Sequence, residues 1–237
     1  MSRRIESQRA WVLHQRDYRD SSRIVEFFTQ QHGRTSAVAK GIKNAKSSLR
    51  GVLQPFTPLV ISWAGKGELK TLVSAETHGR PSGLIGDQLY CGFYLNEVLL
   101  RVLAKEDQYS ELFEWYSLAL SELAAGQPIE VVLRLFEKRL LDALGYGVSF
   151  HSEGHNNMPV LPEQEYRYHP QEGLIRSNPN QPGVKGDALL ALENETLTPM
   201  QAKQLSPMMR ELIQQHIGNK PLNSRALWLS AKKLQSR

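Results

Sequence analysis

The first 80 residues alternate apolar and polar positions with the two-residue period of β-strands. Short glycine-bearing turns at residues 30–33 and 64–67 separate neighbouring runs, which predicts two hairpins. No helical period interrupts the runs, so we predict a small antiparallel barrel, whose closure removes exposed strand edges. The five expected strands, rich in β-branched and aromatic residues, are Ala10–His14, Arg23–Thr29, Arg34–Lys40, Phe56–Trp63 and Leu69–Ala75.

A small, polar and basic segment, Gly41–Gly51, lies between the two hairpins and has a glycine at each end. It has neither a two-residue nor a 3.6-residue apolar period. We therefore predict a mobile loop that projects from the barrel.

From residue 81 the apolar positions take the 3.6-residue period of amphipathic helices. Helices are expected over Leu84–Leu103, over Ser110–Ala124, and from Pro128 to Leu144 with a stop at Gly145. Residues 147–198 are poor in helix signals and form an irregular insertion. Within it, a small hairpin is predicted from Tyr166–Tyr168 and Gly173–Ile175.

Further helices are expected after the insertion. Thr198-Pro199 and Ser206-Pro207 each place a capping residue before a first-turn proline, which predicts two helix starts, the second helix running to Gly218. A last helix is expected from Ser224 to about Leu234. The chain is thus predicted to be an α+β protein, with a barrel domain at residues 1–80 and a mostly helical domain at residues 81–237.

Charge is distributed unevenly along the chain. The formal net charge is +5, from 29 Lys and Arg and 24 Asp and Glu. Residues 1–80 hold 14 basic and six acidic side chains, a net charge of +8, and residues 81–237 hold 15 and 18, a net charge of −3. No acidic residue lies between Glu26 and Glu68. A basic N-terminal third is typical of a polyanion-binding protein, and a solvated basic face without a partner is an equally good reading.

Composition excludes several classes of protein. A hydrophobic fraction of 41% and a charged fraction of 22% indicate a folded globular chain. Cys91 is the single cysteine, so neither an intramolecular disulfide nor a zinc site built on thiolates is possible. The charged N-terminus is unlike a signal peptide, and no window approaches the roughly 20 apolar residues of a membrane span. We expect a soluble, cytoplasmic protein.

Seven short motifs, in order along almost the whole chain, resemble the RecO family of bacterial recombinational-repair proteins. Each motif is only moderately specific, but their ordered combination is strong, and residues 151–198 match least well. The motifs are Val38–Gly41, Leu53–Leu59, Gly67–Leu72, Tyr94–Leu99, Leu133–Glu137, Leu144–Gly147 and Gly218–Arg225.

The resemblance implies an N-terminal OB-fold, a helical C-terminal domain and a non-enzymatic recombination mediator. Such a protein binds single- and double-stranded DNA and anneals complementary strands. Its implied partners are RecR and the C-terminal tail of single-stranded DNA-binding protein, and the outcome is loading of RecA, which would place it in the cytoplasm at the nucleoid. Many relatives carry four zinc-binding cysteines after the Leu-Gly-Tyr motif. This chain has none there, so we predict a member without zinc.

The basic loop is the clearest candidate for phosphate contact, because lysine and arginine neutralise phosphates independently of sequence. Aromatic side chains could add base stacking. We expect Phe28 and Phe56 in the core, whereas Trp11 and Trp63 are ambiguous. The predicted DNA-binding residues are Arg34, Lys40, Lys43, Lys46, Arg50, Lys66 and Lys70.

The partner tail implied by the resemblance is acidic and ends in an apolar residue. Its receptor needs an apolar pocket with cations at the rim. The helix Glu130–Leu144 offers Arg134, Lys138 and Arg139 beside apolar positions, with Arg134 as the first choice. An ordinary solvated helix face is the competing interpretation.

Signals for an enzyme are weak, and we predict no catalytic residue, cofactor or metal. Gly65–Lys70 lacks the order of a phosphate-binding loop, and His151 and His155 lack a third firm ligand. A nuclease would need clustered carboxylates near the basic surface. An RNA-binding module is the remaining alternative, since only the resemblance favours DNA.

Overall fold

The structure is a computed structural model that describes residues 4–178, 181–218 and 220–235. Pro179, Asn180 and Asn219, which fall in the predicted insertion and the last motif, lie outside the described residues. The chain forms two compact units. One comprises Met1–Ala124 with Lys220–Arg237, and the other comprises Ala125–Asn219.

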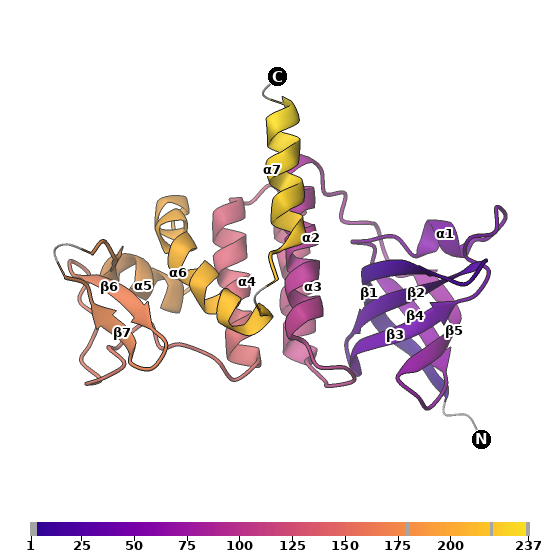
Figure 1. Ribbon diagram of the computed structural model, residues 1–237, viewed down its shortest axis with the longest axis horizontal. Helices are drawn as coiled ribbons and strands as arrows, with labels where there is room; N and C mark the ends of the chain where they lie inside the picture. The colour runs from indigo at the N-terminus through magenta and orange to yellow at the C-terminus, as the bar shows by residue number, and fades with distance from the viewer. Residues whose placement is uncertain (1–3, 179–180, 219, 236–237) are drawn as a thin grey trace. The chain divides into compact units, whose positions relative to one another are not determined.

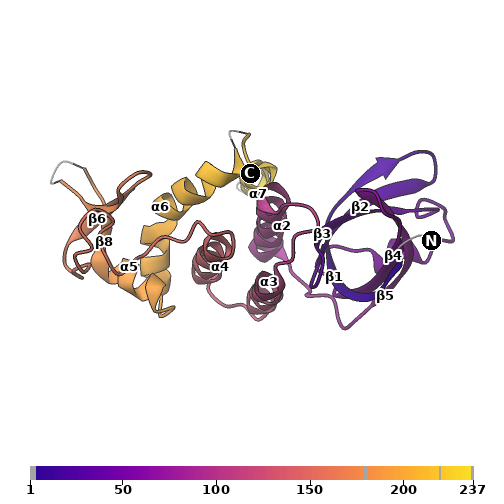
Figure 2. The ribbon, with the colours of Figure 1, turned by 90° about the horizontal axis from the view of Figure 1, so that it is seen from below.

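Five strands form a closed barrel in the first unit, in the order β1-β2-β3-β5-β4 (Figure 2). Each predicted strand is present, which confirms the barrel. The pairs are antiparallel except β3 with β5, where Ser36–Val38 runs parallel to Leu69–Thr71 and closes the ring. The strands are β1 (Arg4–Tyr18), β2 (Ser22–Thr29), β3 (Gly33–Ala39), β4 (Leu59–Ala64) and β5 (Leu69–Thr77).

The barrel interior is apolar and well filled. Val12, Val25 and Phe27 point into it from β1 and β2, and Ile61 and Trp63 reach it from β4. Each of these side chains is no more than 3% exposed. Burial on this scale supplies the main driving force for closing the barrel.

The outer face of β2 is also covered. The ring of Phe28 packs edge-on against Phe113 at 5.4 Å and against Tyr116 at 6.1 Å, and Trp11 of β1 packs against Tyr116 at 5.7 Å. Because helix α3 (Ser110–Ala124) lies on this face, β2 is apolar on both sides.

A β-bulge in β1 is bound by helix α2 (Gly86–Val102). The register of β1 against β2 shifts between Val12 and His14, and Asn96 of α2 donates to the carbonyls of Val12 and Leu13 at 3.3 and 3.1 Å. The Tyr116 hydroxyl donates to the Asn96 amide oxygen at 2.5 Å. This buried network satisfies backbone groups that the bulge removes from the ladder.

The C-terminal helix α7 (Asn223–Gln235) packs on α2, as Figure 1 shows. Its first backbone N–H groups, from Asn223 and Ser224, donate to the Glu97 carboxylate at 2.9 and 2.8 Å. Arg101, one turn along α2, pairs with the same carboxylate at 2.7 Å. Glu97 therefore acts as an N-terminal cap supplied by another helix.

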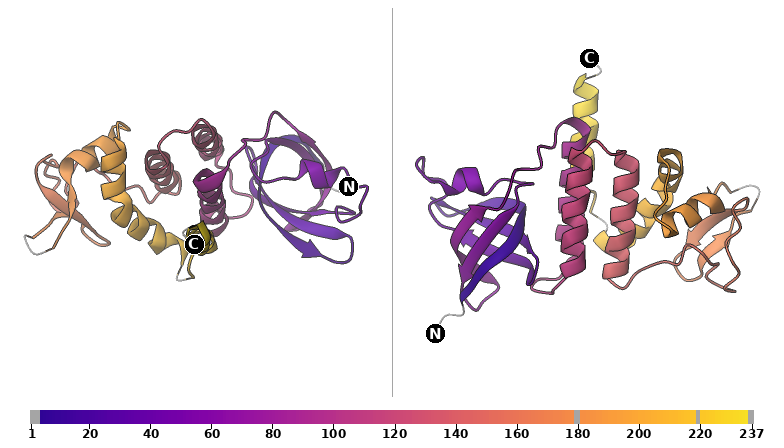
Figure 3. Two further views of the ribbon diagram at one scale, coloured as in Figure 1. Left: turned by 90° about the horizontal axis from the view of Figure 1, so that it is seen from above. Right: turned by 180° about the vertical axis from the view of Figure 1, so that it is seen from behind.

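The basic segment after β3 differs in part from the predicted loop. Its last residues, from Leu49, belong to a short helix, α1 (Leu49–Val52), at one end of the barrel (Figure 3). Ile42 and Leu53 are 2% and 1% exposed and belong to the barrel core. Apolar anchors at both ends of the segment thus hold its backbone against the barrel.

In the second unit, α4 (Ile129–Ala143) packs against α6 (Pro199–Ile217). The predicted hairpin is present as β6 (Glu165–His169) and β7 (Gly173–Arg176), and a third strand, β8 (Val184–Lys185), pairs with β6. Helix α5 (Gly186–Glu193) follows β8 within the segment that we expected to be irregular. Both β8 and α5 are too short for the spacing of their apolar residues to predict them.

The prediction of two helices starting at Pro199 and Pro207 is wrong, because α6 is one helix that contains Pro207. Thr198 and Gln201 form a capping box at the true start. Ala202, Leu205, Met209 and Leu212 keep one buried stripe across Pro207. Continuous packing along this stripe offsets the hydrogen bond that the proline removes.

Candidate nucleic-acid interface

The β1–β2 hairpin and the segment 40–50 meet at one end of the barrel. The Lys43 backbone N–H donates to Ser21 O at 3.0 Å, and Arg23 pairs across the ladder with Ala39. We call this surface the cationic end. Its seven basic residues are Arg16, Arg19, Arg23, Lys40, Lys43, Lys46 and Arg50, against the acids Asp17 and Asp20.

Asp17 ties the two halves of the cationic end together. Its carboxylate pairs with Arg23 at 3.0 Å and with Lys43 at 3.2 Å. The Lys43 ammonium also donates to Arg19 O at 3.3 Å. Hydrogen bonds from Arg23 and then Lys43 lower the pKa of Asp17, so the carboxylate stays charged and partly neutralises Lys43.

Lys40, Lys46 and Arg50 are exposed, and within the described ranges none of the three lies within 4.0 Å of an acidic side chain. They are the predicted DNA-binding residues best placed to meet a phosphate. Arg16 and Arg19, which the sequence analysis counted but did not assign to the site, are exposed on the adjoining hairpin. Arg16 lies near the end of β1 and Arg19 in the turn that follows it, and this position beside the turn could have indicated them.

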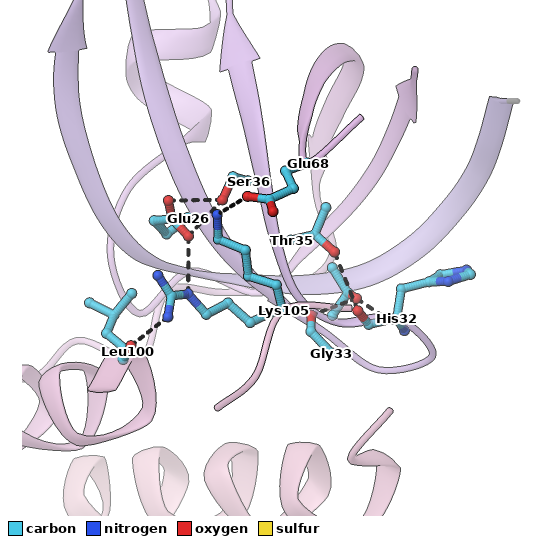
Figure 4. Close-up of polar contacts among 10 residues, drawn as sticks. Glu26, His32, Gly33, Thr35, Ser36, Glu68, Leu100 and Lys105 are labelled. Carbon is cyan, nitrogen blue, oxygen red and sulfur yellow. Dashed lines mark hydrogen bonds and ion pairs between the residues drawn. The ribbon is translucent and has the colours of Figure 1, made fainter. Parts of the chain in front are cut away.

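Arg34 has internal partners. Its guanidinium donates to Glu26 at 3.1 Å and to the Leu100 carbonyl at 2.6 Å, while Ser36 donates to the same carboxylate at 2.9 Å (Figure 4). The neighbouring turn is closely packed too, because a Cβ at Gly33 would overlap the Asp107 carbonyl. Arg34 thus holds the barrel to the end of α2, and we remove it from the DNA-binding set.

Lys70 also faces inward. Its side chain is 7% exposed, and its ammonium pairs with Glu106 at 2.7 Å. A phosphate could reach it only by displacing this carboxylate, so we remove Lys70 as well. The alternation of residues along a strand could not predict that Arg34 contacts Leu100 or that Lys70 pairs with Glu106, because these partners are distant in the sequence.

Lys66 is exposed but lies away from the cationic end. It follows Ala64, which pairs with Arg4 at the start of β1, whereas the β1–β2 hairpin follows Tyr18 at the end of β1. Lys66 therefore remains a separate prediction.

The phenylalanine and tryptophan residues of the barrel are buried, whereas Tyr18 of β1 is half-buried beneath the Arg19 guanidinium. Phe28 and Phe56 lie in the core as predicted, and the two ambiguous residues, Trp11 and Trp63, are only 7% and 3% exposed. Trp11 also donates its indole N–H to Ser117 at 3.0 Å. These rings stabilise the fold and are not available for base stacking.

In the second unit, the predicted tail-binding cations are engaged with acids. Arg134 is 7% exposed and donates to Glu137 at 2.6 Å and to Ser206 at 2.5 Å. Lys138 pairs with Asp142 at 3.1 Å, and Arg139 makes a two-pronged pair with Glu195. The hydrogen bond from Arg139 lowers the pKa of Glu195.

The segment after the Leu144–Gly147 motif is held by a polar network. Glu153 accepts from Arg176 of β7 at 2.6 Å and from Asn156 at 3.0 Å. The described residues contain no group of three His, Cys, Asp or Glu side chains that could hold a metal ion. Among the same residues, no helix is both long enough and apolar enough to cross a membrane.

A closed five-stranded barrel with a cationic end, followed by helices, defines a nucleic-acid-binding protein of the OB type. Comparison of the sequence with known protein families shows which family the chain belongs to. The profile described as "Recombination protein O N terminal" matches residues 1–80, and "Recombination protein O C terminal" matches residues 86–226. The chain belongs to the RecO family of DNA repair and recombination proteins.

Relatives agree over most of their length. The chain is 44% identical to "DNA repair protein RecO" of Aliivibrio salmonicida (strain LFI1238) over 226 residues, 94% of each protein. It is 43% identical to the protein of the same name from Aromatoleum aromaticum, again over 94% of each. For Ralstonia nicotianae the identity is 40% over 236 residues, 98% of this chain and 86% of the relative.

Proposed function

We propose that this protein is a non-enzymatic recombination mediator. It binds single- and double-stranded DNA, anneals complementary strands, and acts with RecR to load RecA onto strands coated by single-stranded DNA-binding protein, in the cytoplasm at the nucleoid. The observation that carries the proposal is the cationic end, where Arg16, Arg19, Lys40, Lys46 and Arg50 are exposed on two adjoining segments. A cationic surface screens two phosphate backbones at once and lowers the repulsion that slows pairing.

The test is a salt titration of binding to a labelled single-stranded oligonucleotide. Wild-type protein is expected to lose affinity linearly in log–log form as salt rises. Changing Lys46→Ala together with Arg50→Ala removes two phosphate contacts, which lowers the slope by about 1.4, at roughly 0.7 per phosphate on a single strand. Lys203→Ala together with Arg210→Ala, which removes two exposed charges from α6, is the matched control and should leave the slope unchanged.

A wild-type protein with no salt dependence, or a double variant that binds like the control, would overturn this placement. Annealing in buffer without magnesium or ATP separates a mediator from an enzyme. The same titration with an RNA oligonucleotide tests the alternative of an RNA-binding module, which predicts tighter binding to RNA than to DNA.

Recognition of the acidic tail by α4 belongs to the same proposal, with a condition. A tail carboxylate must exchange with Glu195 for Arg139 or with Asp142 for Lys138, because both cations are already paired. Glu195→Gln should therefore strengthen binding of a tail peptide, and Arg139→Ala should weaken it, both with unchanged DNA binding. Arg134 is buried beneath this surface, so its substitution is expected to change the stability of the fold. A loss of tail binding in such a variant would therefore not identify a contact with the tail.

A further inference from the structure

A cavity of about 410 Å³ opens in the first unit beside the cationic end. Its volume falls within the roughly 300–1,000 Å³ typical of small-ligand sites. Arg23 and Arg50, both from the cationic end, lie on its wall with the exposed His14. Anything bound at the cationic end therefore lies next to an open cavity.

The wall combines an apolar part with two amides. Phe93 of α2 is half-buried and packs edge-on against Phe56 at 5.1 Å, and Leu53 and Pro55 continue the apolar wall. Gln15 and Gln54 line the cavity, and each donates its amide N–H to a backbone carbonyl, of Leu53 and Arg50 respectively. Each amide can therefore offer a ligand both its oxygen, a hydrogen-bond acceptor, and its second N–H, a donor.

We propose that this cavity takes one unpaired nucleobase of a DNA strand, with the flanking phosphates on Arg23 and Arg50. The site rests on the proposed function and gives it a ligand at the level of a single nucleotide. An apolar, partly aromatic wall suits the face of a base, and two amides that each donate and accept suit the donors and acceptors on its edge. A carboxylate of an acidic peptide has no N–H for the amide oxygens, which favours the base as the occupant.

The geometry also favours single-stranded over double-stranded DNA. The phenylalanine and tryptophan side chains of the barrel are buried, so this cavity supplies a base contact that they do not. A base inside a duplex reaches it only after unpairing and unstacking, whereas a base in a single strand needs no such step. The cationic end binds either form through phosphates, and the cavity favours the single strand.

The test compares two single-stranded oligonucleotides of equal length and charge, one with ordinary bases and one with abasic residues throughout. Wild-type protein should bind the base-bearing strand about tenfold more tightly, as stacking of one base on protein supplies. His14→Trp fills the mouth of the cavity and should reduce this preference to below twofold without changing the salt slope. His78→Trp, at another exposed histidine of the same unit, should keep the preference.

Three outcomes would overturn the site, and they differ from failure of the proposed function. The first is equal binding of the two oligonucleotides with a steep salt dependence, where phosphate binding stands and the cavity proposal falls. The second is an undiminished preference in His14→Trp. The third is that His14→Trp loses binding of a short acidic peptide but keeps the preference for the base-bearing strand. That result would assign the cavity to a peptide. Absence of binding to either oligonucleotide would instead reject the proposed function. Urea unfolding of both variants confirms that they are folded.

Discussion

The Nε atom of Arg34 lies 3.1 Å from Oε2 of Glu26, and both side chains are largely buried. The Arg34 guanidinium also satisfies a carbonyl in the last turn of α2, that of Leu100. A basic residue in the basic third of the chain thus serves the fold, because its charge is already matched inside the first unit.

Arg34→Met is expected to lower the free energy of unfolding by about 2 kcal/mol, because it leaves the Glu26 carboxylate without its charged donor. Affinity for single-stranded DNA should stay within twofold of wild type. Lys40→Met is the matched control, since Lys40 follows the same strand but is exposed. It should keep its stability and lose DNA affinity. Urea denaturation and anisotropy measure the two quantities, and the reverse pattern would return Arg34 to the interface.

Arg16→Ala combined with Arg19→Ala should weaken binding to single-stranded DNA and lower its salt slope by about 1.4, as loss of two phosphate contacts requires. Both side chains are exposed on the β1–β2 hairpin, and that hairpin contacts Lys43. The double change Lys203→Ala with Arg210→Ala on α6 removes the same charge elsewhere. If both double variants lose the same slope, net charge and not the cationic end governs binding.

Asn96→Ala should destabilise the protein by about 2–3 kcal/mol, because it removes the amide that donates to the carbonyls of Val12 and Leu13 and accepts from the Tyr116 hydroxyl in a buried site. Tyr116→Phe removes one hydroxyl and should cost about 1 kcal/mol. Asn44→Ala, at an exposed asparagine, should stay within about 0.5 kcal/mol of wild type. Urea unfolding followed by tryptophan fluorescence provides the comparison.

The Glu153–Arg176 pair should contribute stability only above acidic pH. Burial raises the pKa of Glu153, but hydrogen bonds from Arg176 and Asn156 outweigh it, so the folded-state pKa lies below the ordinary 4.5. A lowered pKa means that the stabilisation is fully present above pH 4.5 and is lost as the pH falls through the folded value. Arg176→Met should therefore be less stable than wild type at pH 7, and the gap should narrow at pH 3. A gap that is constant with pH would show that packing and not charge holds the pair together.

Much of the fold was predictable because its elements have clear periods. The five barrel strands, α2, α3, α4, α7 and the β6–β7 hairpin follow from local alternation or from 3.6-residue apolar spacing. Pro207 led to the wrong prediction of a second helix start, because a serine–proline pair is typical of a helix N-terminus when only its neighbours are considered. The apolar stripe through Leu205 and Met209 contained the correct answer.

The site was less predictable, for a physical reason. Whether a lysine or arginine meets solvent or an acid depends on contacts between residues far apart in sequence, such as Lys70 with Glu106. Charge counting located the cationic end, but it could not separate Lys46 from Lys70. The cavity beside Phe93 was equally hard to predict, because its wall comes from five separate segments of the chain.

The Glu153–Arg176 ion pair holds its segment of the protein together without any cysteine. Residues 147–198 contain no cysteine, so nothing in this stretch can be oxidised to a disulfide or stripped of a thiolate-bound ion. Chelators, which would remove a thiolate-bound ion, should therefore leave this part of the protein folded.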